Sequence, residues 1–328
     1  MEQVRWGRQS KEDGAGGMEH RIKSEMLVQM LLYINNLDWT RFDCTGAFDN
    51  IFDILIKFML TELNKNDIYQ EYTRLDTIEP YQVGTLKAVD TKILNKLGVL
   101  KCCNRKSIRV VGCDFNFIIK FALLKAFERT TLFESELRYW LNLYDEVENS
   151  SSIDRSSLED MPAEYRDLGR IALMIIDLDA LYRGLHGENE SYKQVEWFIW
   201  QEFLACYIER NCDWRVSKQL IIKRDLFNSK PDIVMTKDNT GIVVDAKHYK
   251  KLNIEGSVYQ VSYYMTELSR VIDDIKFGVI VCTSNKNKRS STGITVNKMY
   301  IQYIDITRGF NNLLTYMEEF LAWMIDSV

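Results

Sequence analysis

The chain has 328 residues, of which 46% are hydrophobic, so it is long enough to form two domains with packed cores. Its formal net charge of −5 argues against a protein that binds nucleic acid through its overall charge. No apolar stretch has the length of a membrane-spanning helix, because charged residues interrupt the apolar segments at residues 117–127 and 171–182.

The first part of the chain carries no sign of secretion or of a disulfide framework. Residues 1–20 lack the apolar core of a signal peptide, and we expect them to be a disordered leader. The seven cysteines have no CxxC spacing, which favours reduced thiols over a zinc site or disulfides. These features predict a cytoplasmic protein that has no membrane partner.

Residues 21–188 are predicted to be a mixed α/β region that continues into a largely helical one. Amphipathic helices and short strands alternate as far as about residue 130, and residues 134–182 have helical patterning interrupted by the polar linker 148–157. The segment HGENES at residues 186–191 is typical of a hinge. We therefore place the start of a second domain at residue 189.

Residues 189–328 are predicted to form a mixed sheet flanked by helices. The expected helices and strands follow in the order helix, strand, hairpin, helix, strand, strand, helix. Their clearest members are helices at residues 192–210, 256–271 and 311–325 and the strand FGVIVCT.

A hairpin is predicted within residues 231–247, PDIVMTKDNTGIVVDAK. Strands at residues 233–235 and 242–244 are rich in β-branched side chains, which favour pleated structure. Residues 237–241 form a polar connection that ends in glycine, as a hairpin loop often does.

Three charged side chains of this hairpin point to chemistry. If the hairpin closes about Asn239, Asp232 lies almost level with Asp245 and Ala246. Asp245 and Lys247 are two residues apart, so they project from the same face of the sheet. Two carboxylates suit a hard cation such as Mg²⁺, and a lysine beside them can orient a water or stabilise charge on a phosphate.

The same pattern is also typical of an ordinary polar hairpin whose aspartate and lysine face solvent. Two observations favour the metal site. Asp245 follows three apolar β-branched residues, so it ends a strand that we expect to be buried, where an unpaired charge is costly. Gln260 and Tyr264 stand four apart on one face of the next helix.

The hairpin resembles that of the PD-(D/E)xK nuclease superfamily. Within that superfamily, VDAKHYKK followed by VYQVSYYM is similar to the McrC family, the nuclease subunits of 5-methylcytosine restriction systems, with LlaJI-type restriction subunits as a close alternative. The similarity extends to SEMLVQMLLYINNL, IEPYQVGTLKAVDT and CDFNFIIKFALLKAF, so it covers nearly everything from Ile22 onward.

The resemblance implies a restriction-endonuclease-like C-terminal core in which Asp232 and Asp245 hold Mg²⁺ and Lys247 is catalytic. An acidic residue usually lies on the helix before the hairpin, where this chain has Gln201 followed by Glu202. Successive helical residues are about 100° apart, so only one of the two faces the site, and we assign Glu202 to catalysis. The residues expected to support the site or to contact the DNA backbone are Gln201, Lys250, Gln260 and Tyr264.

The uneven distribution of charge agrees with a nucleic-acid substrate. Acids outnumber bases over residues 131–210, whereas bases outnumber acids over residues 211–251, which include the hairpin. A second basic cluster, NKNKR at residues 285–289, is expected in a loop, where it contacts phosphates or is merely solvated.

The function implied by the resemblance is that of a metal-dependent DNA endonuclease subunit. The chain has no GxxxxGK[ST] motif, so GTP is expected on a partner, a McrB-like AAA+ GTPase hexamer. Residues 21–188 are then the region that docks on this partner and stimulates its GTP hydrolysis. The expected substrate is double-stranded DNA with modified cytosine, and dimerisation during cleavage stays open. Two alternatives are a non-cleaving subunit that activates the motor and a stand-alone repair or resolvase nuclease.

Overall fold

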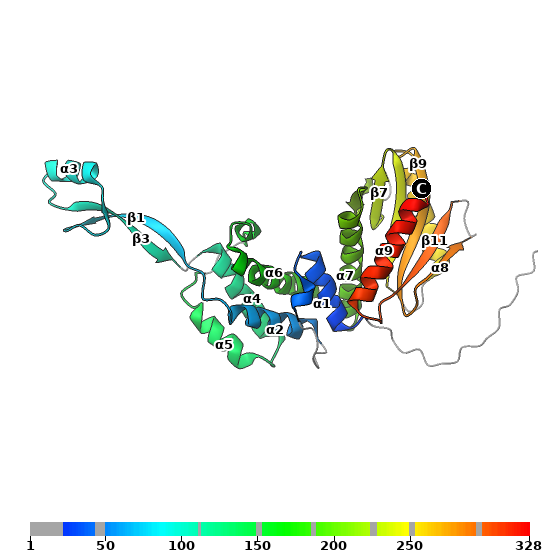
Figure 1. Ribbon diagram of the computed structural model, residues 1–328, viewed down its shortest axis with the longest axis horizontal. Helices are drawn as coiled ribbons and strands as arrows, with labels where there is room; N and C mark the ends of the chain where they lie inside the picture. Colours follow the sequence, from blue (N-terminus) through cyan, green and yellow to red (C-terminus); the bar gives the residue numbers. More distant parts are fainter. Residues whose placement is uncertain are drawn as a thin grey trace, which may run out of the picture. The chain divides into compact units, whose positions relative to one another are not determined.

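The computed structural model describes residues 22–42, 50–110, 113–148, 153–184, 188–223, 228–248, 253–292 and 297–328 (Figure 1). The chain divides into two compact units. The first, here called the helical unit, is Lys23–Val216, and the second, the sheet unit, is Ser217–Val328 with Ile22. The leader expected at residues 1–20 lies outside the described residues.

The helical unit is built from amphipathic helices that bury their apolar faces against one another. Helix α4 packs along α6 and α1 along α7, and the buried side chains between them are mostly Leu, Ile, Met and Phe. The unit contains α1 (Ser24–Ile34), η1 (Trp39–Arg41), α2 (Ile51–Leu63), α4 (Asp114–Arg129), α5 (Glu134–Leu143), η2 (Arg155–Leu158), α6 (Ala163–Gly184) and α7 (Glu188–Asn211).

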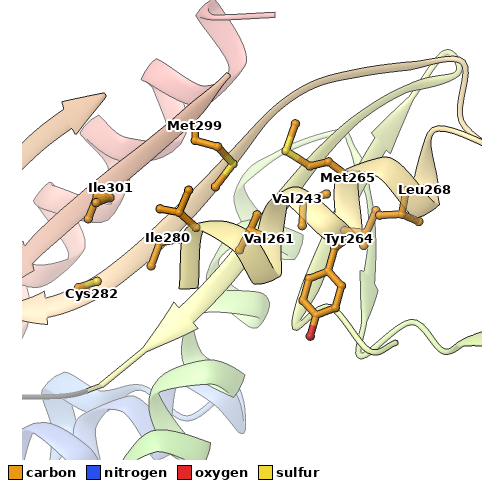
Figure 2. Close-up of a cluster of buried hydrophobic side chains, with 11 residues drawn as sticks. Val243, Val261, Tyr264, Met265, Leu268, Ile280, Cys282, Met299 and Ile301 are labelled. Atoms are coloured by element: carbon orange, nitrogen blue, oxygen red, sulfur yellow. The ribbon is translucent and has the colours of Figure 1, made fainter. Parts of the chain in front are cut away.

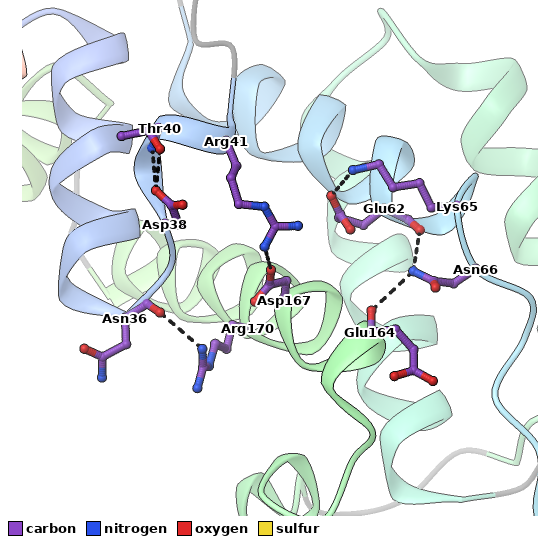
Figure 3. A network of polar contacts seen from close by, with 10 residues as sticks. All are labelled: Asn36, Asp38, Thr40, Arg41, Glu62, Lys65, Asn66, Glu164, Asp167 and Arg170. Carbon is purple, nitrogen blue, oxygen red and sulfur yellow. Dashed lines mark hydrogen bonds and ion pairs between the residues drawn. The ribbon is translucent and has the colours of Figure 1, made fainter.

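Polar contacts join α6 to the segment that follows α1, as Figure 3 shows. Arg41 Nη1 lies 2.7 Å from Asp167 Oδ2, and Arg170 Nη1 donates to the carbonyl oxygen of Asn36 at 3.2 Å. Because these groups are near solvent, each contact contributes little to stability, and the apolar core holds the helices together.

A small sheet with its own helix, here called the arm, occupies residues 71–110 of the helical unit. Its strands are β1 (Glu71–Glu79), β2 (Thr85–Leu86) and β3 (Cys102–Val110), in the antiparallel order β1-β3-β2, and its helix is α3 (Ala88–Lys96). Helix α3 has no buried residue. The arm therefore exposes large apolar side chains, among them Ile78, Tyr81, Val89, Ile93, Leu97 and Leu100.

The sheet unit is a six-stranded mixed sheet, which confirms the fold predicted for the C-terminal region. Its strand order is β10-β11-β9-β8-β7-β4, in which β8, β9 and β11 are parallel, β7 is antiparallel to β8 and β10 is antiparallel to β11. The strands are β4 (Arg215–Lys218), β7 (Ile233–Lys237), β8 (Thr240–Lys247), β9 (Asp274–Ser284), β10 (Lys288–Thr292) and β11 (Met299–Asp305). Two short strands, β5 (Ile222–Lys223) and β6 (Asn228–Ser229), pair separately.

Each face of this sheet is covered by one helix. Helix α8 (Ile254–Leu268) packs on the face that carries Val243, Ile280 and Met299, and Figure 2 shows its side chains meeting that cluster. Helix α9 (Phe310–Asp326) covers the other face, where the Trp323 ring lies 5.5 Å from that of Phe277. Both helices were expected from the sequence, at residues 256–271 and 311–325.

Three details differ from the sequence-based expectations. Helix α7 begins at Glu188, so residues 188–191 of the expected hinge are helical, because acidic residues are tolerated in the first turn of a helix. The basic cluster at residues 285–289 is not all loop, since Lys288 and Arg289 begin β10. The compact units divide at Ser217 and not at residue 189, which assigns α7 to the helical unit.

No helix among the described residues combines the length and apolarity needed to cross a bilayer.

Candidate metal-dependent hydrolytic site

The pairing of β7 with β8 places the two acidic residues of the hairpin opposite each other. Ile233 pairs with Val244, so Asp232 stands opposite Asp245, as the sequence predicted. The connection is shorter than expected, because Lys237 already pairs with Thr240. The two turn residues have positive φ, +48° at Asp238 and +63° at Asn239, which is the geometry of a tight two-residue hairpin turn.

Both carboxylates are held by the strand that follows the turn. Asp232 Oδ2 accepts a hydrogen bond from the backbone N–H of Ala246 at 2.9 Å. Asp245 is 1% exposed, and its Oδ2 lies 2.7 Å from Lys247 Nζ. Because Asp245 and Lys247 share a face of β8, one strand supplies both an anion and its counter-cation.

Helix α8 adds two polar side chains to this arrangement. Lys247 Nζ donates to Gln260 Oε1 at 3.3 Å, and Gln260 Nε2 donates to the Tyr264 hydroxyl at 2.8 Å. Gln260 and Tyr264 are one helical turn apart, so they lie together on the helix surface. The pairing expected from the sequence therefore exists and reaches Lys247.

Burial dominates the electrostatics of the site. Removal from water raises the pKa of Asp245 to about 7, and the Lys247 ammonium opposes that rise while the Asp232 carboxylate adds to it. Burial also raises the pKa of Asp232, against the attraction of Lys247 and the Ala246 N–H. Burial alone lowers the pKa of Lys247, but attraction to Asp245 outweighs it, so that pKa is raised and the side chain stays cationic.

The donor set fits a hard divalent cation. The Asp232 and Asp245 carboxyl groups are within hydrogen-bonding reach of each other, so in ionised form they repel, and a cation held between them removes that repulsion. The described residues contain no group of three or more His, Cys, Asp or Glu side chains suited to a metal. An ion held by two carboxylates keeps several waters, which suits Mg²⁺.

The other expected site residues lie elsewhere in the chain. Gln201 and Glu202 are on α7, within the helical unit; Gln201 is 2% exposed and Glu202 is half-buried. The assignment of Glu202 as the additional acid stays a prediction. Lys250 lies outside the described residues. His248 follows Lys247 in the chain, and its Nδ1 contacts the Thr283 hydroxyl.

One neighbour of the site was not found from the sequence. Cys282 of β9 stands level with Lys247, and burial, with a contribution from the Asp245 charge, raises the pKa of its thiol to about 12. The thiol is therefore neutral. Nothing in the sequence indicated this proximity, because the register between β8 and β9 is set by their parallel pairing and not by local pattern.

Comparison with known proteins gives one structural likeness that carries weight. No family model and no curated protein matches the chain. The structure is similar to a chain of the Thermococcus gammatolerans McrB AAA+ hexamers with bound McrC, with a TM-score of 0.56 and 14% identity, over 92% of this chain and 76% of that one. The T. gammatolerans McrBC complex is also matched, with a TM-score of 0.38 and 14% identity, over 47% of this chain and 52% of that one. The first likeness spans both units, and it confirms at the level of the fold the McrC-like chain that the sequence predicted.

Proposed function

We propose that this chain is a metal-dependent DNA endonuclease that works as the nuclease subunit of a GTP-dependent, modification-dependent restriction complex. The observation that carries the proposal is the hairpin, on which Asp232 and Asp245 stand opposite each other and Lys247 pairs with Asp245. Two adjacent carboxylates and a lysine at the end of a buried strand form an arrangement suited to hydrolysis of a phosphodiester.

The residues of the site have distinct roles in this proposal. Asp232 and Asp245 hold Mg²⁺, which when bound polarises the phosphodiester and makes a coordinated water more acidic. Lys247 has a raised pKa, so it acts as a fixed cation that stabilises charge on the phosphate and orients the water, and not as the base. Gln260 positions the Lys247 ammonium, and Tyr264 fixes the Gln260 amide.

The partner in this proposal is a McrB-like AAA+ GTPase hexamer. The similar solved structure contains McrB AAA+ hexamers with bound McrC, and the arm of this chain exposes the apolar side chains that a protein partner covers. GTP belongs to the partner, because the sequence has no P-loop motif. The substrate is double-stranded DNA with modified cytosine.

The test is cleavage by the assembled complex with Mg²⁺ and GTP. We expect Asp245→Asn to lower the rate of cleavage by at least about a thousandfold, because it removes one of two acidic ligands while keeping the shape of the side chain. Asp274→Asn, an exposed acid on β9, is the matched control and leaves the rate unchanged. Full cleavage by Asp245→Asn contradicts the assignment of the site.

A second function, activation of the motor without cleavage, is favoured by the exposed apolar arm. It predicts that the wild type and Asp245→Asn stimulate GTP hydrolysis by the partner equally well, and that the wild-type complex never cuts DNA. A stand-alone nuclease predicts instead that this chain cuts DNA with Mg²⁺ in the absence of the partner and of GTP. Measuring GTP hydrolysis and DNA cleavage in the same reactions separates the three functions.

A further inference from the structure

A row of four side chains crosses the sheet from the hairpin to the edge strand. Lys247 of β8 stands level with Cys282 of β9, Cys282 with Tyr303 of β11, and Tyr303 with Lys288 of β10. Residues that are level on paired strands project from the same face of a sheet. Cys282 belongs to the buried cluster that α8 covers, and Tyr303 is partly buried and packs against it; Figure 2 shows Cys282 on that face beside Ile301. The row therefore lies on the face that carries the site.

The outer end of this row offers a donor and a cation. Lys288 is exposed and Tyr303 is half-buried, and among the residues that the structure describes neither has a carboxylate partner. Packing of the Tyr303 ring against the cluster fixes the direction of its phenol. Cys282, between them and Lys247, is neutral and buried, so no negative charge interrupts the row.

The opposite face of the sheet holds the edge strand in place. Arg289 Nε donates to Gln302 Oε1 at 2.8 Å, and its guanidinium lies 3.7 Å from the centre of the Trp323 ring. Gln302 Nε2 also donates to Asn287 Oδ1 at 2.9 Å, which fixes the turn before β10. Arg289 is thus committed to the α9 face, and Lys288 is the β10 cation that faces the site.

We propose that Tyr303 and Lys288 bind DNA backbone phosphates of the cleaved strand, to one side of the phosphate that the hairpin cleaves. The inference rests on the proposed function, which it deepens by giving the path of the bound strand. Neighbouring strands are about 4.8 Å apart, so Lys288 stands roughly 14 Å from Lys247 along the row. That length spans several phosphates of one DNA strand, which follow at about 3.4 Å along the helix axis. The phenol donates a hydrogen bond to a phosphate oxygen, and the ammonium neutralises a phosphate further along the strand.

The salt dependence of DNA binding tests this row. The full-length protein is titrated with a short DNA duplex over a series of NaCl concentrations, with Ca²⁺ in place of Mg²⁺ so that the duplex stays intact. We expect Lys288→Gln to weaken binding several-fold and to reduce the slope of log K against log [NaCl] by about 1, which is the value for one lost phosphate contact. Tyr303→Phe weakens binding while leaving the slope unchanged, because it removes a hydrogen bond and no charge.

Lys298→Gln is the matched control. Lys298 is an exposed lysine just before β11, at the opposite end of the sheet from the row, and we expect its variant to bind like the wild type. If Lys288→Gln and Tyr303→Phe behave as this control does, the row is not a DNA contact, even when the wild type cleaves. If the wild type binds no DNA, the inference also fails. If Lys288→Gln reduces the salt-dependence slope but the wild type does not cleave DNA with Mg²⁺ and the partner, the row is a DNA contact and the proposed function fails.

Discussion

Three effects act on the carboxyl group of Asp245: burial, repulsion by a second carboxylate and pairing with a lysine. Its side chain is almost fully buried, it faces the carboxyl group of Asp232, and its counter-charge among the described residues is Lys247. Under the proposed function, protons and Mg²⁺ therefore compete for the same carboxylate. This competition gives the site a pH dependence that is measurable without any DNA.

We expect Asp245 to make the folded protein less stable as pH rises. Its pKa is about 7 in the folded chain, mainly because of burial, against 3.8 for an ordinary aspartate. Between about pH 4 and pH 7 the folded state holds a proton that the unfolded state has released, so the free energy of unfolding falls as pH rises and levels off above pH 7. Asp245→Asn removes the part of this fall that Asp245 causes and is the more stable protein at pH 8, by a few kcal/mol at most, since each pKa unit is worth about 1.4 kcal/mol.

Chemical unfolding in EDTA at pH 5 and pH 8 measures this difference. Asp274→Asn serves as the control, because Asp274 is exposed and its variant keeps the wild-type pH dependence. Mg²⁺ added at pH 8 raises the unfolding midpoint of the wild type and not that of Asp245→Asn. Equal midpoints for wild type and Asp245→Asn at both pH values rule out the raised pKa.

At the scale of the elements, the sequence predicted what depends on local pattern. Alternation in β8 placed Asp245 and Lys247 on one face, and closure of the hairpin placed Asp232 opposite Asp245. The two-residue turn was missed, although Asp238 and Asn239 are of the types that most often adopt positive φ after glycine. The order of β9, β11 and β10 is set by pairing between distant segments, so the row that ends at Lys288 was beyond reach.

The contact between α8 and the sheet depends on Gly278, which no local pattern in the sequence singles out. A Cβ at this position meets Met299 Sδ at 2.5 Å and Val261 Cγ1 at 2.7 Å. We expect Gly278→Ala to destabilise the protein by about 1–3 kcal/mol, because the overpacked core pushes α8 away from β9. Since α8 carries Gln260, the rate of DNA cleavage falls as well, although no site residue is changed.

Thermal unfolding and cleavage of the same preparations check this effect. Gly184→Ala is the matched control, because a Cβ there meets nothing within 4 Å. If Gly278→Ala is as stable as the wild type, the core accommodates a methyl group and α8 is not held by this close approach.

For the whole molecule, the two units separate two kinds of surface. The sheet unit holds the carboxylates and the lysine of the hairpin, whereas the arm, in the helical unit, exposes its apolar side chains. Val89 and Leu97 are each 73% exposed and Leu100 is 84% exposed, so burial within the chain does not account for them. Under the proposed function, docking on a partner and hydrolysis of DNA therefore use different residues, and we expect substitutions to affect one without the other.

We expect the triple substitution Val89→Ser, Leu97→Ser and Leu100→Ser to impair the partner function alone. Exposed side chains contribute little to folding, so the free energy of unfolding stays within about 0.5 kcal/mol of the wild type. Loss of an apolar docking surface raises the concentration of this chain that half-maximally stimulates GTP hydrolysis by the McrB-like partner, by about tenfold or more.

Leu132→Ser, which changes a leucine that is 61% exposed outside the arm, leaves that concentration unchanged. Asp245→Asn gives the converse result, because it stimulates GTP hydrolysis fully and does not cut DNA. Unaltered stimulation by the triple variant would remove the arm from the interface and place the docking surface on the helices of the same unit.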